Sequence, residues 1–460
     1  MTNLPKISAR AMALEILYLV DHDEAYSNLA LNSVLEKYRP EKLDRGFVTE
    51  LVYGVLRTRN TLDWVLGRFL KKPITGLTPW IRNILRAGVY QLMYMDKVPE
   101  SAAVNESVNL AKRYGHKGTV GLVNGVLRNV VRNLKEITFP DREKQPVQYI
   151  AVRYSHPEWL VERWLGEFGF AETVELCQAN NEIPSNAVRT NTLRINRDEL
   201  SQKLTEEGIQ VAEGRFAPET LVLDGFKSVG SIAAHREGLF LVQDESSTLV
   251  GHALQPAPGS RVIDACSAPG GKTTHLAQLM GNRGRIVACD VHEHKIDLIR
   301  ENADRLGITI IEPLLYDAAS LHEKFAGEQA DYILVDAPCS GLGVLRRRPE
   351  IRWRKEPEQI KELPKLQLAI LESAVRCLKP GGVLVYSTCT ITEEENTGVV
   401  REILRRRPDL QPEGLQDCLP GALSDMAGLD TSQAGYVQFL PHRHGMDGFF
   451  IARFRKIGGA

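Results

Sequence analysis

The stretch at residues 381–390 reads Gly-Gly-Val-Leu-Val-Tyr-Ser-Thr-Cys-Thr and predicts a strand that ends beside a cysteine. A pair of glycines turns the chain into a run of apolar residues with high β-propensity. The run stops at Thr388, so Cys389 should lie just beyond the end of the strand. In open α/β sheets, ligands bind in the crevice outside the carboxyl ends of the strands. The sequence therefore predicts a thiol that faces a ligand rather than the core.

The same arrangement occurs earlier in the chain. Residues 331–336, Asp-Tyr-Ile-Leu-Val-Asp, read as a second buried strand, which runs into the loop Ala-Pro-Cys-Ser-Gly at 337–341 and so carries Cys339. One strand-end cysteine is more often an inert buried residue. Two of them at the same edge of a sheet predict a shared pocket.

Strands and helices alternate from about residue 243 to residue 455. This alternation predicts a Rossmann-like α/β domain with a doubly wound, mainly parallel sheet. The expected strands are residues 261–265, 285–290, 308–315, 331–336 and 383–386. The expected helices are residues 275–280, 295–306, 319–325 and 362–377. The tail predicts an antiparallel pair at 436–440 and 448–454, after an exposed loop at 425–433.

Composition and length fit a soluble protein of two or three domains. No apolar run approaches the roughly eighteen residues of a transmembrane helix, and the first residues lack a signal-peptide layout. We therefore expect a cytoplasmic protein that does not enter a membrane. The seven cysteines are odd in number and form no Cys-x-x-Cys pair, which argues against both a disulfide framework and a zinc site. Reduced thiols and no metal are expected.

The N-terminal region, residues 1–140, predicts an all-α domain. Apolar residues at three- and four-residue spacing favour seven helices, at residues 9–20, 28–37, 45–58, 62–70, 79–95, 102–114 and 120–133. Residues 51–135 hold fourteen Lys and Arg but four Asp and Glu, a local excess that suits a polyanion partner. Candidates for a phosphate-binding face are Arg57, Arg59, Lys71, Lys72, Lys112, Arg113, Arg128 and Arg132. The alternative is a solvated polar surface.

Residues 138–147 contain two prolines and several charges and predict a linker. A helix is expected from about residue 156 through Trp164, followed by strands at 185–193, 221–223 and 239–242 and a charged helix at 197–207. Together they predict a small α+β unit whose topology the periodicity does not settle. The predicted domains are thus residues 1–140, 150–242 and 243–460.

The loop at residues 266–273, Cys-Ser-Ala-Pro-Gly-Gly-Lys-Thr, follows the first strand of the large sheet. A phosphate loop would require glycine at position 266, and Pro269 removes one of the backbone N–H groups that cradle phosphates. The dinucleotide pattern Gly-x-Gly-x-x-Gly is also absent. A glycine turn and a helix N-terminus remain, which can receive the carboxylate of a ligand.

Two aspartates extend this predicted ligand site. Asp290 closes the second strand, where a carboxylate can bind ribose hydroxyls. Asp317 follows the third strand and either accepts a hydrogen bond from an adenine amine or caps a helix. A nucleoside that carries a carboxylate but no polyphosphate fits S-adenosylmethionine. The candidate cofactor-binding residues are Cys266, Ser267, Ala268, Pro269, Gly270, Gly271, Lys272, Asp290, Asp317 and Asp336.

Three motifs closely resemble those of the RNA cytosine-5 methyltransferase family. They are Asp-Ala-Cys-Ser-Ala-Pro-Gly-Gly-Lys at 264–272, Asp-Ala-Pro-Cys-Ser-Gly at 336–341, and Ser-Thr-Cys-Thr at 387–390 with Glu395-Asn396. Residues 243–247 and 442–449 resemble the flanking motifs of that family, and the basic helices resemble a NusB-like RNA-binding module. Ser267 stands where alanine is more usual and Leu342 where threonine is common, and neither change removes a chemical group.

The resemblance implies transfer of a methyl group from S-adenosylmethionine to carbon 5 of a cytosine in 16S ribosomal RNA, at position 967. It implies that the partner is 16S rRNA or an assembling small ribosomal subunit, and we expect the enzyme to be a monomer. It also implies that Cys389 is the nucleophile, that Cys339 assists release, and that Asp336 binds the amine and ring nitrogen 3 of the cytosine.

Two thiols suit this chemistry. Carbon 5 of cytosine is a poor nucleophile, and addition of a thiolate at carbon 6 pushes electron density onto it. The hydrogen on carbon 5 must then leave, which requires a second group near that atom. A free thiol is largely protonated at neutral pH, so a cation beside Cys389 would help. Lys272, Arg352 and Arg354 are the candidates, and the sequence does not choose among them.

Other residues are candidates for RNA contact. Arg346, Arg347 and Arg348 with Trp353 could hold phosphates and a flipped or neighbouring base, the alternative being an ordinary surface loop. By resemblance alone, Arg189 and Asn191 also face RNA. Two other functions remain open: a tRNA cytosine-5 methyltransferase, and a non-catalytic RNA-binding or antitermination factor, which would not need the two cysteines.

Overall fold

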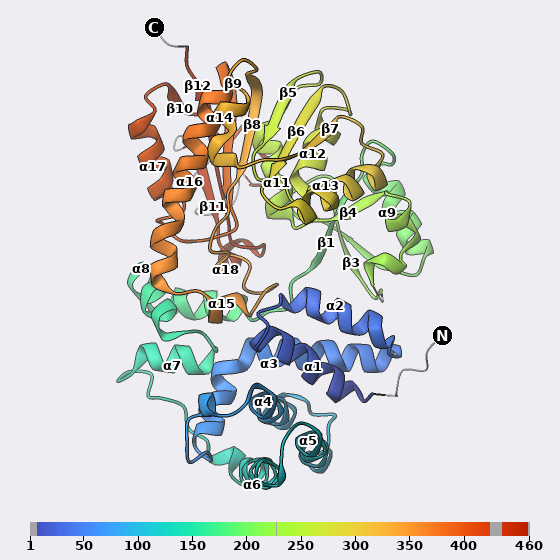
Figure 1. The fold of residues 1–460 in the computed structure, drawn as a ribbon, viewed down its shortest axis with the longest axis vertical. Helices are drawn as coiled ribbons and strands as arrows, with labels where there is room; N and C mark the ends of the chain where they lie inside the picture. The colour runs from blue at the N-terminus through green and yellow to red at the C-terminus, as the bar shows by residue number, and fades with distance from the viewer. Residues whose placement is uncertain (1–6, 227, 424–434, 459–460) are drawn as a thin grey trace. The chain divides into compact units, whose positions relative to one another are not determined.

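The computed structural model describes residues 7–226, 228–423 and 435–458, and the chain forms two compact units (Figure 1). Unit 1 is Met1–Glu182 with Leu345–Arg354, and unit 2 is Ile183–Val344 with Lys355–Ala460. The chain therefore leaves unit 2 after Val344 and contributes ten residues to unit 1 before it returns. The predicted loop at 425–433 lies outside the described residues, and the three predicted domain boundaries stay predictions.

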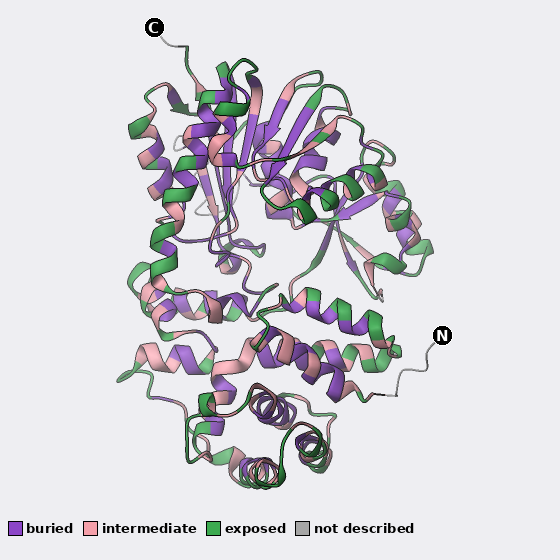
Figure 2. Cartoon of the chain, in the orientation of Figure 1, coloured by how far each residue is buried: buried purple, intermediate pink, exposed green. Residues whose placement is uncertain are grey.

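Unit 1 is built from helices, of which the first six share one apolar core, visible as buried inner faces in Figure 2. Ser8 caps the first helix through its side chain, and Thr78 with Pro79 opens the fourth, as helix starts favour. The elements of unit 1 are α1 (Ala9–Asp21), α2 (Ser27–Tyr38), α3 (Lys42–Gly67), η1 (Ile74–Gly76), α4 (Pro79–Tyr94), α5 (Glu100–Tyr114), α6 (Lys117–Asn133), η2 (Leu134–Glu136), α7 (Pro146–Arg153), α8 (Glu158–Ala179) and α15 (Ile351–Arg354).

The prediction of two helices at 45–58 and 62–70 is wrong, because α3 runs unbroken through the polar residues between them. Thr61 is 1% exposed, and its hydroxyl donates to the carbonyl of Val152 at 2.6 Å. Asn60 Nδ2 donates to the carbonyl of Ala151 at 2.9 Å. Both acceptors belong to α7, a helix that begins inside the predicted linker and supplies partners that the local sequence does not reveal.

Unit 2 contains a small four-stranded antiparallel sheet in the order β2-β3-β1-β4. All three strands expected in this region form, and β2 is an additional edge strand. A capping box between Asn196 and Glu199 starts the predicted charged helix. The elements are β1 (Asn186–Thr190), α9 (Arg197–Glu206), β2 (Gln210–Glu213), β3 (Thr220–Asp224), η3 (Val229–Ser231), α10 (Ala233–Arg236) and β4 (Phe240–Val242).

The large sheet of unit 2 confirms the doubly wound, mainly parallel prediction. Strands β9-β8-β5-β6-β7 are parallel neighbours in that order, and β12 continues the sheet antiparallel to β9, with β10 and β11 paired to it. The elements are α11 (Glu245–Leu254), β5 (Arg261–Asp264), α12 (Gly271–Leu279), β6 (Arg285–Asp290), α13 (Glu293–Leu306), β7 (Ile311–Leu315), η4 (Ala318–Ser320), α14 (Leu321–Lys324), β8 (Ala330–Asp336), α16 (Pro357–Cys377), β9 (Leu378–Thr388), α17 (Thr397–Arg406), β10 (Leu410–Pro412), η5 (Gly421–Leu423), β11 (Tyr436–Phe439), α18 (Pro441–His444) and β12 (Phe449–Lys456).

Both faces of the large sheet are covered, which explains why its strands read as continuous apolar runs (Figure 2). Alternate strand residues enter opposite cores. Val262 and Leu334 pack into the core that holds apolar side chains of α11, α12 and α13. Ile263 and Val335 pack into the core that holds those of α16 and α17. The sheet is thus a rigid frame whose strand ends can position a site.

Candidate active site

The carboxyl ends of β8 and β9 lie level with each other. Asp336 pairs with Ser387 in the parallel register, and the N–H of Ala337 donates to the carbonyl of Ser387 at 2.9 Å. The loops that follow these strands meet, so that the Sγ atoms of Cys339 and Cys389 are 3.4 Å apart. Both residues are partly exposed. The structure therefore brings together the two cysteines predicted to share a pocket.

A third predicted residue, Asp336, lies beside them and is fixed on both carboxylate oxygens. Lys272 Nζ donates to one oxygen at 2.7 Å, and Ser387 Oγ donates to the other at 2.8 Å. Burial opposes the charge of Lys272, but the charges of Asp336 and Cys389 raise the pKa of Lys272 above its usual value. Lys272 is thus a fixed positive charge whose field reaches Cys389.

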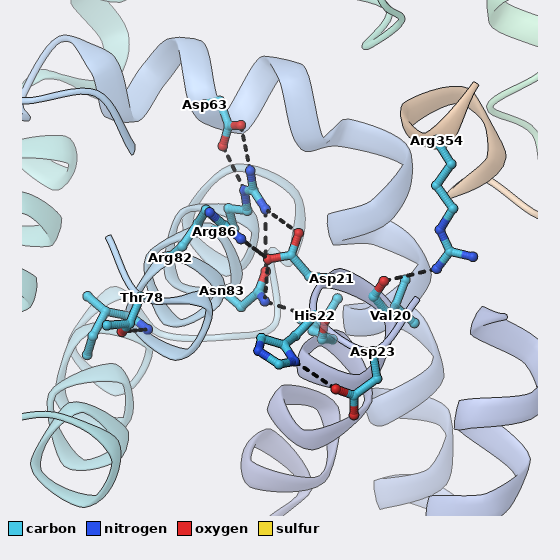
Figure 3. Close-up of polar contacts among 12 residues, drawn as sticks. Val20, Asp21, His22, Asp23, Asp63, Thr78, Arg82, Asn83, Arg86 and Arg354 are labelled. Carbon is cyan, nitrogen blue, oxygen red and sulfur yellow. Dashed lines mark hydrogen bonds and ion pairs between the residues drawn. The ribbon is translucent and has the colours of Figure 1, made fainter. Parts of the chain in front are cut away.

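The other two candidate cations, Arg352 and Arg354, donate their hydrogen bonds to other parts of the chain. Arg352 is fully buried within unit 1, where its guanidinium donates to the carbonyls of Ser155 and Asn180 at 2.9 and 3.0 Å and to the side chain of Asn181 at 2.8 Å. Burial lowers the pKa of Arg352 to about 9. Arg354 donates to the carbonyls of Val20 and Ala25 at 2.9 and 2.7 Å in the same unit, and Figure 3 shows its bond to Val20. Of the three candidates, Lys272 is therefore the one that the structure favours.

The RNA-contact candidates near Arg352 also differ in how far they are exposed. Arg346 is buried, and Trp353 donates its Nε1–H to the carbonyl of Leu56 at 3.2 Å while the guanidinium of Arg59 lies 5.3 Å from its ring. Arg346 therefore lies in the interior of unit 1, which contradicts its predicted role, whereas Trp353 is partly exposed and its contact with RNA stays a prediction. Arg347 is partly exposed and Arg348 is exposed, and both remain candidates.

The cysteines elsewhere in the chain include buried thiols with which the pair can be compared. Burial raises the pKa of Cys177 to about 12 and that of Cys377 to about 11, as expected for inert core thiols. The pKa of Cys339 is also raised, chiefly by its hydrogen bond with Cys389, then by burial and by the negative charges of Cys389, Glu395 and Asp336. Cys339 therefore holds its proton while it stands beside Cys389.

The predicted cofactor loop joins β5 to α12. Gly270 has a φ of +97° and precedes α12, and no side chain caps the first turn of that helix. Its first N–H groups are therefore available to a ligand carboxylate. Ser267 anchors the loop to β6, because its N–H and its hydroxyl both donate to the carbonyl of Cys289, at 2.8 and 2.9 Å. The serine that departs from the family pattern thus has a structural role.

The two ribose and adenine candidates have different surroundings. Asp290 ends β6, is 9% exposed, and accepts the N–H of His292 at 3.1 Å. Asp317 is exposed and accepts the N–H of Ala319 at 2.9 Å, which is the helix-capping alternative. Their contacts with a nucleoside stay predictions.

Arg189 and Asn191 are fully buried, so the prediction that they face RNA is wrong. Arg189 Nε donates to Gln278 at 2.8 Å, and its Nη atoms donate to the carbonyl of Gly271 at 2.7 Å and to Thr274 at 2.9 Å. These acceptors lie on one side of α12. Arg189 of the small sheet is thus hydrogen-bonded to α12, the helix whose first turn follows the cofactor loop.

One group among the described residues has the spacing of metal ligands: Glu219, His252 and His275. Both imidazole Nε2 atoms contact the same oxygen of Glu219, at 2.9 and 2.7 Å. A metal-bound histidine normally donates its other N–H to an acceptor. The Nδ1 of His275 is buried without a hydrogen-bond partner, so this cluster fits direct hydrogen bonds better than a metal.

The basic residues of unit 1 are partly internal. Arg82 pairs with Asp21 at 2.5 Å and Arg86 pairs with Asp63 at 2.7 Å, and both pairs are drawn in Figure 3. Burial lowers the pKa of Arg59 to about 10, so this partly exposed arginine keeps its charge at neutral pH and remains a candidate. Six candidates are exposed and are called the basic set: Lys71, Lys72, Lys112, Arg113, Arg128 and Arg132.

Among the described residues, each helix is too short or too polar to cross a membrane.

Comparison with known families matches three regions of the chain. Residues 251–455 match the family described as 16S rRNA methyltransferase RsmB/F, and residues 7–132 match the NusB family. Residues 156–230 match the ferredoxin-like domain described for RsmF/B-like methyltransferases. The three matches follow one another along the chain and leave few residues uncovered.

Individual relatives agree with these matches. A Bacillus subtilis protein named probable ribosomal RNA small subunit methyltransferase B is 41% identical over 99% of this chain and 100% of its own. The solved structure of PH0851 superposes with a TM-score of 0.84 at 30% identity, covering 98% of this chain and all of that one. NSun6 from Pyrococcus horikoshii, solved with SFG, gives a TM-score of 0.59 at 27% identity over 66% of this chain and 99% of its own.

Proposed function

Because the chain belongs to the family of 16S rRNA methyltransferases RsmB/F and is an S-adenosylmethionine-dependent rRNA methyltransferase, we propose that it methylates carbon 5 of a cytosine in 16S rRNA. The observation that carries the proposal is the pair of sulfurs, 3.4 Å apart at the carboxyl edge of the sheet. Methylation of a base nitrogen or of a ribose oxygen has no need for two thiols, whereas methylation of carbon 5 requires one to add and a second group to assist its departure.

In this proposal Cys389 adds to carbon 6 of the cytosine. A sulfur–carbon bond forms, and the electrons of the double bond between carbons 5 and 6 move toward carbon 5, which then takes the methyl group. In this proposal the carboxylate of Asp336, held by Lys272 and Ser387, accepts hydrogen bonds from the amine of the base and from a proton on ring nitrogen 3. A proton on ring nitrogen 3 would withdraw electrons from the ring, and the hydrogen bond from the amine, which uracil lacks, would favour cytosine.

Release reverses the addition. Cys339 helps to take up the proton on carbon 5, and the electrons of the broken carbon–hydrogen bond re-form the double bond between carbons 5 and 6. The sulfur–carbon bond then breaks, and Cys389 leaves as a thiolate. Once Cys389 is bonded to carbon its thiolate charge is gone, so one of the causes that keep Cys339 protonated disappears at the step that needs a base. The two sulfurs would thus act in sequence.

The cofactor site fits the donor. S-adenosylmethionine supplies the methyl group when it is bound. The uncapped first turn of α12 is suited to its carboxylate, and Asp290 to its ribose hydroxyls. Position 967 as the target, an assembling small subunit as the substrate and a monomeric enzyme remain predictions. The NusB-family match and the rRNA methyltransferase relatives favour rRNA over tRNA, and a non-catalytic factor leaves the paired sulfurs unexplained.

Substitution of each cysteine tests the proposal. We expect Cys389→Ala to abolish methylation, and Cys339→Ala to leave protein covalently bound to RNA as a slowly migrating band in a denaturing gel. Cys418→Ala, which lies outside the site, is the control and should methylate normally and leave no adduct. An adduct that persists in Cys389→Ala, or modification of an atom other than carbon 5 by mass spectrometry of RNA digests, would refute the proposal.

A further inference from the structure

Glu395 is a charged residue buried directly behind the two cysteines. It is 0% exposed and lies in the turn between Cys389 and α17. One carboxylate oxygen accepts the N–H of Ser340 at 2.8 Å and the side-chain N–H of Gln367 at 3.0 Å. The other accepts the hydroxyl of Thr392 at 2.8 Å. All three partners donate, as an ionised carboxylate requires.

The residues on both sides of Cys339 are tied to this carboxylate. Ser340 bonds to it directly, and Gln367, which bonds to it as well, also donates to the carbonyl of Pro338 at 3.0 Å. The loop can therefore shift its sulfur only by breaking hydrogen bonds to a buried charge. Such bonds contribute more to stability than those between neutral groups.

The next residue, Asn396, holds the second cysteine in the same way. Thr388 donates its hydroxyl to Asn396 Oδ1 at 2.6 Å, and Asn396 Nδ2 donates to the carbonyl of Thr390 at 3.1 Å. Thr388 and Thr390 flank Cys389. The hydroxyls of Thr390 and Ser340 are also 2.7 Å apart and join the two loops.

We propose that Glu395 and Asn396 are positioning residues that fix the two cysteine loops against each other, and that the Glu395 charge keeps the proton shared by the sulfurs on Cys339. This charge would thereby determine that Cys389 is the cysteine that attacks. The inference deepens the proposed function, on which it rests for the identity of the nucleophile.

The charges around Cys339 support this assignment. Negative groups face it from three elements: Asp336 at the end of β8, Cys389 after β9, and Glu395 before α17; the Tyr386 hydroxyl, with a raised pKa, is also near. The positive charge of Lys272 is paired with Asp336 and acts on Cys389. Glu395 thus favours a thiol at Cys339, and Lys272 favours a thiolate at Cys389.

Glu395→Gln tests the charge with little change in shape. The glutamine oxygen can still accept from Ser340 and Gln367, while its NH₂ group can donate to Thr392. The measurement is alkylation of the free full-length protein by iodoacetamide at pH 7, with mass spectrometry reporting which sulfur reacts. The thiolate displaces iodide and forms a sulfur–carbon bond, so the modified site reports the thiolate.

We expect wild type to be alkylated first at Cys389. In Glu395→Gln the ratio of Cys339 to Cys389 modification should rise about tenfold, as loss of a nearby charge shifts a proton equilibrium by about one pKa unit. The control is Glu393→Gln, which removes an exposed carboxylate two residues away that pairs with Arg401 and should leave the ratio unchanged.

Two results would overturn the inference. One is an unchanged ratio in a folded Glu395→Gln protein, with folding checked by its melting temperature. The other needs no variant: wild type that reacts first at Cys339 contradicts the assigned proton position directly. Because this assay contains neither RNA nor cofactor, its failure is distinguishable from failure of the methylation proposal, which the covalent-adduct gel tests.

Discussion

Arg189 offers the sharpest test of how unit 2 supports its cofactor site. Its guanidinium is 0% exposed and donates to Gly271, Thr274 and Gln278 of α12 and, in a close contact, to Gln243. Arg189→Met keeps most of the side-chain volume but leaves these acceptors without their donor. The perturbation therefore removes hydrogen bonds and a charge rather than packing.

The expected cost follows from these hydrogen bonds. A hydrogen bond to a charged group contributes about 1.5–3 kcal/mol, and the four bonds are not additive because they share one guanidinium. Breaking a buried charged network by removing one partner typically costs about 3–5 kcal/mol. We expect unit 2 to lose stability by about that amount, which corresponds to a fall in Tm of roughly 10 °C.

The same change should weaken cofactor binding, because Gly271 lies in the first turn of α12. Calorimetry of the full chain would measure Tm, and isothermal titration would measure the Kd of S-adenosylmethionine, which we expect to rise about tenfold. The matched control is Arg197→Met in α9, a partly exposed arginine whose ion pairs with Asp198 and Glu213 should contribute less than about 1 kcal/mol.

The outcome distinguishes two roles for Arg189. If Arg189→Met leaves both Tm and cofactor affinity equal to those of the Arg197→Met control, the reasoning from burial is refuted. If RNA affinity falls while Tm is unchanged, the RNA-facing role expected from the sequence is restored. A lower Tm with normal cofactor affinity would keep the structural role but refute the link to the cofactor helix.

Two further predictions concern charge. Substitution of the basic set by alanine should weaken RNA binding, measured by filter binding at several salt concentrations. The slope of log affinity against log salt should fall by about 0.7–0.9 for each phosphate that the protein no longer neutralises. A slope equal to that of wild type would assign RNA binding to other residues. Asp264 is buried, and burial raises its pKa to about 7. The folded state therefore binds a proton at Asp264 that the unfolded state releases. The contribution of Asp264 to the free energy of unfolding is present at low pH and is lost as pH rises toward 7. Asp264→Asn should therefore stabilise the protein by about 2 kcal/mol more at pH 8 than at pH 5.5. Melting curves of the variant and wild type test this, and an equal shift in Tm at the two pH values would contradict it.

The basic-residue prediction is best tested by substitution rather than by truncation. Deletion of residues 1–140 would remove the helices against which Arg354 and Trp353 pack, although both follow the Cys339 loop in the sequence. A truncated chain would thus expose part of the core of unit 1. Loss of RNA binding in that protein would not report on phosphate binding by the basic set.

Local sequence patterns determined the framework of the site. The apolar runs before Asp336 and Cys389 predicted buried parallel strands, and the strand ends placed two cysteines at one edge, as the 3.4 Å sulfur separation confirms. Such patterns are readable because strand periodicity and the position of a strand end depend on neighbouring residues. Together with the family motifs, they also led to S-adenosylmethionine and ribosomal RNA.

Only the tertiary structure decided which polar residues are buried and what they hold. Arg352 finds its partners 171 residues away in Asn181, and Arg189 finds Gly271 across 82 residues, so neither environment is visible in the local sequence. Glu395 was part of a recognised motif, yet its hydrogen bonds to the Cys339 loop depend on how β8 and β9 pair. A charged side chain can be buried only where distant segments converge to satisfy it. That convergence is a property of the fold. It determines which charged residues stay at the surface and which are buried and position the residues of the site.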